Sequence, residues 1–92
     1  MLISATILVN VERGSTNEVA QSIVDIDGVE NVFSVTGRFD LVVLVKVKDM
    51  EALSKISNEH FDKIEKIKSV ETLVSMKVFS NKELEDNFSV GV

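Results

Sequence analysis

The stretch Val35-Thr36-Gly37-Arg38-Phe39-Asp40 separates two segments that the sequence predicts to be strands, 29–35 and 41–47. Gly37 supplies a positive φ at no steric cost, which a tight reversal of the chain needs. A sharp turn exposes backbone N–H groups, and Asp40 places a carboxylate within reach of them. The stretch therefore predicts a β-hairpin whose turn is a candidate site for a small zwitterion. A plain hairpin turn with a solvated aspartate is the alternative interpretation.

Hydrophobic periodicity predicts two further strands and two helices around this hairpin. Residues 2–12 and 70–79 alternate between apolar and polar side chains, as half-buried strands do. Ser15 and Glu18 have the spacing of a capping box, which predicts a helix that begins there and ends before Gly28. Asp49 is a suitable N-cap for a second helix. The apolar stripe of that helix consists of Met50, Leu53, Ile56, Phe61, Ile64 and Ile67.

The predicted order of elements is β-α-β-β-α-β, which favours an α+β, ferredoxin-like sandwich. Its four-stranded antiparallel sheet carries both helices on one face. The segment 41–47 is apolar on both faces for most of its length, which indicates a central strand. We expect one domain over residues 1–80, followed by a C-terminal tail, 81–92. The tail either forms a short turn and an edge strand, of this sheet or of a neighbour's, or is disordered.

Two helices leave the other face of the sheet uncovered. The alternation places a group of apolar side chains there, among serines and threonines, and covering a contiguous apolar group is favourable. We expect this face to pack on a second copy in a two-fold homodimer, and such dimers to join into a ring. The residues assigned to this dimer face are Leu8, Val32, Val42, Leu44 and Leu73.

Composition excludes several classes of protein. The chain has 92 residues, no cysteine, and ten basic against fifteen acidic residues. An excess of negative charge disfavours direct binding to nucleic acid, and nothing in the sequence indicates a metal or cofactor. No apolar run approaches the length of a membrane span, and the N-terminus has no basic region of a signal peptide. We expect a soluble, cytoplasmic protein.

Several segments, in order, resemble the C-terminal effector-binding domain of the Lrp/AsnC regulators, also called the RAM domain. They are 4–11, 28–32, 35–43, which contains the Gly-x-aromatic-Asp element, and 67–72. The resemblance covers residues 2–79. It implies a non-enzymatic domain that binds a small-molecule effector, typically an amino acid, and acts in transcriptional or metabolic regulation.

The resemblance also implies a site. By position, the backbone amides of Gly37 and Arg38 would bind the carboxylate of the amino acid, and Asp40 its ammonium group. Phe39 would shape the pocket, and Thr72 of a neighbouring dimer would add a hydroxyl. The guanidinium of Arg38 would pair either with the ligand carboxylate or with Asp40.

The family's regulators carry a helix-turn-helix domain before this one, and nothing before the first predicted strand resembles it. We therefore expect a stand-alone effector domain that acts by sensing a ligand or through another protein, such as a full-length Lrp/AsnC regulator. A fragment of a longer chain is the alternative interpretation.

Two other functions remain open at this point. One is a small dimeric ferredoxin-like enzyme, of the monooxygenase or isomerase type, which would need polar groups between the helices and the sheet. The core-facing positions are almost wholly apolar, and His60 is the only histidine. The other is a ligand-independent assembly partner of a full-length regulator.

Overall fold

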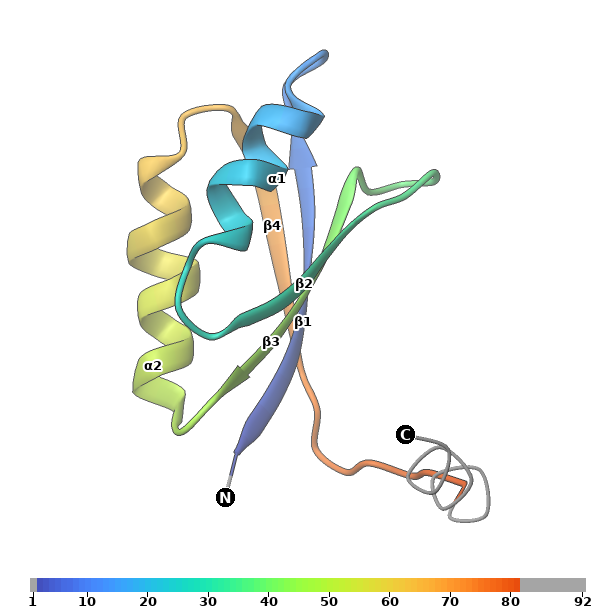
Figure 1. Cartoon of the computed structure of the whole chain (residues 1–92), viewed down its shortest axis with the longest axis vertical. Coiled ribbons are helices and arrows are strands. Elements are labelled where there is room, and N and C mark those ends of the chain that lie inside the picture. The colour runs from blue at the N-terminus through green and yellow to red at the C-terminus, as the bar shows by residue number, and fades with distance from the viewer. Residues whose placement is uncertain (1, 82–92) are drawn as a thin grey trace.

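The computed structural model describes residues 2–81 and contains a four-stranded sheet with both helices on one side (Figure 1). The elements run in the predicted order. They are β1 (Ile3–Val11), α1 (Thr16–Val24), β2 (Val29–Ser34), β3 (Leu41–Val47), α2 (Met50–Lys55), which continues as Ile56–His60 and Phe61–Lys63, and β4 (Ile67–Val74). The ferredoxin-like α+β fold is confirmed.

The sheet has the order β2-β3-β1-β4, and all neighbouring strands are antiparallel. β1 and β3 are therefore the central strands, as the doubly apolar sequence of β3 predicted. Ile7 pairs with Val43 on one side and with Thr72 on the other. Alternate residues of β1 and β3 are buried, because one face of each strand lies under the helices.

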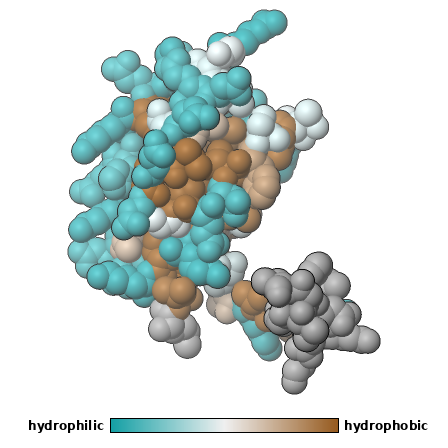
Figure 2. All heavy atoms as spheres, viewed as in Figure 1, coloured by the Kyte–Doolittle hydropathy of each residue, from teal (hydrophilic) through white to brown (hydrophobic). Residues whose placement is uncertain are grey.

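The core lies between the helices and the sheet. Apolar side chains from the two central strands meet others from α1 and from residues 50–63, which we call the α2 segment. The buried members are Ala5, Ile7, Val9, Val11, Val19, Ile23, Leu41, Val43, Val45, Val47, Leu53, Ile56 and Phe61. In Figure 2 apolar side chains still reach the surface over α1 and β2. α1 has only nine residues, about 14 Å, so it covers its part of the sheet incompletely.

A β-bulge in β2 corrects one prediction about the dimer face. Val29 pairs with Val45, but Asn31, not Glu30, pairs with the next residue, Leu44. The extra residue reverses the faces of the strand beyond it. Val32 therefore lies opposite Val43 and packs against the core, whereas the sequence alternation had placed it on the uncovered face.

We call the uncovered side of the sheet the open face. Phe33 takes the place predicted for Val32, because it lies opposite Val42, and 47% of its surface is exposed. The registers keep Leu8, Val42, Leu44 and Leu73 on this face as predicted. By the same registers its polar and charged members include Ser4, Thr6, Asn10, Asn31, Lys46 and Glu71.

The helical segment after β3 contains a π-turn that explains its apolar stripe. Asp49 caps the segment as predicted, because its Oδ1 accepts a hydrogen bond from the Ala52 amide at 2.8 Å. The buried residues Ile56 and Phe61 are five positions apart, and the Phe61 N–H donates to the Ile56 carbonyl. A π-turn has this i→i+5 bond, which keeps both side chains on the covered side. Ile67, assigned to the helix from its spacing, is instead the first residue of β4.

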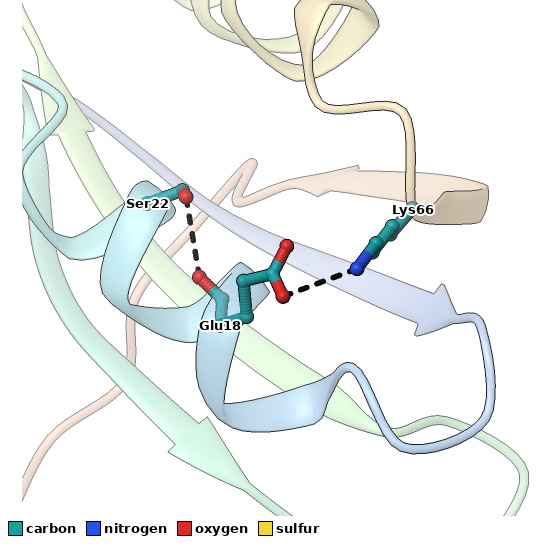
Figure 3. Close-up of polar contacts among 3 residues, drawn as sticks. All are labelled: Glu18, Ser22 and Lys66. Atoms are coloured by element: carbon teal, nitrogen blue, oxygen red, sulfur yellow. Dashed lines mark hydrogen bonds and ion pairs between the residues drawn. The ribbon is translucent and has the colours of Figure 1, made fainter.

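The start of α1 differs from the predicted capping box. The Ser15 side chain makes no cap hydrogen bond and is buried, and its amide donates to the Glu12 carbonyl at 3.0 Å. Glu18 instead reaches Lys66, with its Oε1 3.1 Å from the Lys66 Nζ (Figure 3). Ser22 donates from its hydroxyl to the Glu18 carbonyl. The Glu18–Lys66 ion pair joins α1 to the residues before β4, but its exposure limits its contribution to stability.

β4 starts earlier and ends earlier than predicted, at Ile67 and Val74 in place of residues 70 and 79. The ladder to β1 ends with Ala5 opposite Val74, followed by a hydrogen bond from the Ser75 amide to the Ser4 carbonyl at 2.9 Å. β1 begins at Ile3, so residues beyond Met76 have no neighbouring strand to pair with. The predicted turn and edge strand of the tail, 81–92, fall almost entirely outside the described residues.

The junction between α1 and β2 yields a stability prediction. Gly28 and Gly14 both have positive φ angles, 99° and 81°. A Cβ at Gly28 would lie 2.9 Å from the buried Val47 Cγ1, whereas nothing lies within 4 Å of one at Gly14. Gly14→Ala should lower the free energy of unfolding by about 1–2 kcal/mol, the cost of the left-handed conformation. Gly28→Ala should cost about 1–3 kcal/mol more, because a packed neighbour must move.

Urea unfolding at one fixed protein concentration measures both variants, and fixing the concentration removes any effect of association. An equal decrease in the free energy of unfolding for the two variants would show that the close contact at Gly28 does not affect stability.

Candidate functional site

The connection between β2 and β3 contains six residues, 35–40, and is folded against β1. The Val35 amide donates to the Asp40 carbonyl at 3.0 Å and closes the turn. The Asp40 amide donates to the Val9 carbonyl, also at 3.0 Å. The backbone of the turn is therefore fixed both to itself and to a central strand.

The Asp40 carboxylate also holds the turn in place. Its Oδ2 accepts a hydrogen bond from the Val11 amide at 2.9 Å, and the side chain is half-buried. The β1–β3 ladder ends at the pair Val9–Leu41, so the carboxylate supplies an acceptor where strand pairing has stopped. Asp40 therefore has a structural bond that the interpretation as a solvated turn residue did not include, and no pattern in the sequence indicates this bond.

The tip of the turn presents unpaired backbone N–H groups. Gly37 has φ of 136° and is exposed, as is Arg38. Within residues 2–81, the amides of residues 36–39 have no hydrogen-bond partner in the structure. The Arg38 guanidinium lies 5.7 Å from the centre of the half-buried Phe39 ring, a cation–π contact. In the described part of the chain, Arg38 makes no ion pair with Asp40.

Thr72 lies apart from the other predicted site residues within one chain. It pairs with Ile7, on the far side of β1 from β3, so two strand spacings, about 10 Å, separate β4 from β3. Thr72 lines a groove between the α2 segment and β4 with a volume of about 420 Å³, together with Ser57, Asn58 and Phe61. The structure thus brings Gly37, Arg38, Phe39 and Asp40 together and places Thr72 on a different surface.

The family model for the Lrp/AsnC ligand binding domain matches residues 4–84. The chain belongs to the Lrp/AsnC ligand-binding domain family. Among curated proteins, the HTH-type transcriptional regulator FL11 of Pyrococcus furiosus is 34% identical over 79 residues, which are 83% of this chain and 50% of that protein. An uncharacterized HTH-type regulator of the same organism is 34% identical over 76 residues, 83% of this chain and 51% of its own length.

Solved structures share the fold. TTHA0845 from Thermus thermophilus superposes with a TM-score of 0.82 at 29% identity, over 86% of this chain and 99% of that one. A transcriptional regulator of Neisseria meningitidis, NMB0573, described as a complex with L-Met, superposes with a TM-score of 0.77 at 20% identity. The superposition covers 86% of this chain and 53% of that regulator. Escherichia coli AsnC has the same TM-score at 17% identity, over 86% of this chain and 55% of its own.

These comparisons confirm the resemblance on which the site was based. The chain spans about half the length of the curated relatives that it matches, and those relatives are transcriptional regulators. Within residues 2–81, no helix is long and apolar enough to span a membrane. In the same range, no three His, Cys, Asp or Glu side chains gather as metal ligands would. That the domain stands alone stays a prediction.

The bond between Asp40 and Val11 can be tested by two substitutions. Asp40→Ala removes the acceptor and leaves the N–H of the buried Val11 unsatisfied, which should cost about 1–3 kcal/mol of unfolding free energy. Asp40→Asn keeps an acceptor oxygen and should retain most of this stability. Urea unfolding gives the free energies, and hydrogen exchange at the Val11 amide should accelerate in the alanine variant. Equal destabilisation by both substitutions would contradict the role of the carboxylate oxygen as an acceptor.

Proposed function

We propose that this domain is a non-enzymatic effector-binding and oligomerisation domain in transcriptional or metabolic regulation, and that its effector is an amino acid. The observation that carries the proposal is the turn, where unpartnered N–H groups adjoin a carboxylate. The family is one of ligand-binding domains, and the Neisseria meningitidis regulator of the same fold is described as a complex with L-Met.

An amino acid has charges that suit this turn. Its carboxylate would accept hydrogen bonds from the Gly37 and Arg38 amides, which lack partners in the described residues. Its ammonium group would donate to the Asp40 carboxylate, whose Oδ1 is not used by the bond to Val11. Phe39 would form an apolar wall, held in place by Arg38 above its ring. The guanidinium of Arg38 would strengthen binding of the ligand carboxylate by its charge.

The turn of a single chain leaves a bound amino acid exposed to water, so we infer that a second subunit completes the site. Gly37 and Arg38 are exposed, and Thr72 lies on another surface of the same chain. Thr72 of a neighbouring dimer would contribute its hydroxyl from the groove beside α2. Repeated contacts of this kind between dimers would close into a ring.

The dimer itself would form through the open face. Leu8, Val42, Leu44 and Leu73 lie on it with Phe33, and about 48% of Leu73 is exposed. Covering a few hundred Å² of apolar surface is worth several kcal/mol, at about 25 cal/mol per Å², before the costs of association. Polar members such as Thr6 among these residues would fix the register of the two sheets.

Calorimetric titration with each of the twenty amino acids tests the site. Asp40→Asn removes the negative charge but keeps the acceptor for Val11, so it separates binding from folding better than Asp40→Ala does. A charged hydrogen bond contributes about 1.5–3 kcal/mol, so the asparagine variant should bind its amino acid about 10- to 100-fold more weakly. Asp25→Asn, an exposed change at the end of α1, should leave the affinity unchanged.

Unchanged affinity in Asp40→Asn would disprove the proposed ammonium contact. If no amino acid binds the wild-type chain and the dimer persists, the domain acts instead as a ligand-independent assembly partner.

Sedimentation velocity tests the dimer. Leu73→Lys buries a charge in the proposed interface and should shift the protein to monomer at concentrations where the wild type is dimeric. Val24→Lys is a matched control on the helical side, where 42% of the side chain is exposed, and it should leave the dimer intact. A wild-type chain that is monomeric at every concentration would overturn the proposal.

A further inference from the structure

The segment that follows β4 is apolar and extends away from the rest of the chain. We call residues 75–79 the arm. The exposed fractions of Met76, Val78 and Phe79 are 98%, 73% and 82%. The Phe79 ring has a local contact, with the Lys77 Nζ 5.0 Å from its centre. A segment of five residues that exposes three large apolar side chains is unusual on the surface of a single chain.

The arm has the sequence of a strand but no strand beside it. Its apolar and polar residues continue the alternation of β4, which is why the sequence predicts a strand as far as residue 79. The ladder ends with Val74 opposite Ala5, and β1 extends only two residues beyond Ala5, to Ile3, so most of the arm has no strand beside it. The arm therefore has no strand to pair with in its own chain, and the open face of another copy offers it an apolar surface.

We propose that the arms of two copies are exchanged, so that each arm packs on the open face of the other copy. This inference rests on the proposed two-fold dimer and adds a part to it. Figure 1 shows the arm turning to the side of the sheet away from the helices, which is the side where the open face of a second copy would lie. The open face supplies exposed apolar partners, Phe33 and Leu73.

Charge and length agree with this arrangement. Glu71 is an exposed open-face residue without an ion pair among the described residues, and the arm carries one cation, Lys77. Five extended residues span about 16 Å. Sheets that pack face to face lie about 10 Å apart, so an arm of this length can reach from its own sheet to the open face of the other copy at the edge of the interface. The outer surface of α2 suits the arm less well, because it presents mainly polar and charged side chains (Figure 2).

The test compares dimer dissociation constants of full-length chains by sedimentation equilibrium. The arm variant carries Met76→Ser, Val78→Ser and Phe79→Ser. The control carries Val24→Ser and Met50→Ser, which remove exposed apolar side chains from the helical side.

Loss of three buried apolar side chains from each arm should raise the dissociation constant about 100-fold or more. The control should stay within about threefold of the wild type. Circular dichroism should show the same fold for all three proteins, because every changed residue is exposed.

The possible outcomes separate a failure of the arm exchange from a failure of the open-face dimer. An increase of about tenfold or more in the arm variant alone supports the exchange. A smaller increase, or an equal one in the control, overturns it and leaves the open-face dimer standing. A wild-type monomer at all concentrations overturns both.

Cross-linking locates the arm. The chain contains no cysteine, so introduced cysteines are unique. Phe79→Cys is mixed with Asn31→Cys, on the open face in the edge strand β2, or with Ser57→Cys, in the groove beside α2, and one partner carries a size tag. A short bis-maleimide should join Phe79→Cys to Asn31→Cys more efficiently. Preferential joining to Ser57→Cys would place the arm in the groove and overturn the proposal.

Discussion

Two helices can cover only one face of a four-stranded sheet, and the rest of this structure depends on that constraint. The central strands β1 and β3 supply most of the core, and their alternate residues are buried under α1 and the α2 segment. The same strands place the opposite set of side chains on the open face. Apolar residues such as Leu44 stand there beside Thr6 and Lys46, a mixture that resembles the interface of a dimer more than a core.

The sequence predicted the order of the elements, the central position of β3 and the cap at Asp49, because these depend on local periodicity and local hydrogen bonds. The predictions from periodicity failed where an inserted residue shifts the pattern of buried and exposed positions. The bulge in β2 moves Val32 into the core and Phe33 out of it, and alternation cannot reveal an extra residue. Phe61 is buried as its place in the apolar stripe predicted, but the π-turn that gives it a spacing of five from Ile56 was not predicted. β4 ends at Val74, where its ladder with β1 stops at Ala5, and the alternation of β4 itself continues beyond that point.

The candidate site was predictable in place but not in its internal bonds. Gly37 and Asp40 mark a turn in the sequence, and the family resemblance selected the same residues. The bond from Val11 to Asp40 could not be predicted, because it arises only where the β1–β3 ladder stops and a backbone amide needs an acceptor. Asp40 is therefore structural as well as a candidate ligand residue. Thr72 lies on the expected strand, but its position facing the groove beside α2 follows from the sheet register.

The anchoring of the turn has a consequence for kinetics. Asp40 is bonded to β1 through both its amide and its carboxylate, so the base of the turn is held to the sheet. A molecule held between this turn and a neighbouring subunit, as proposed, would then be released by separation of the subunits rather than by opening of the turn. Its residence time would then follow the lifetime of the assembly, and the rate at which such a sensor responds to a falling effector level would be set by subunit dissociation.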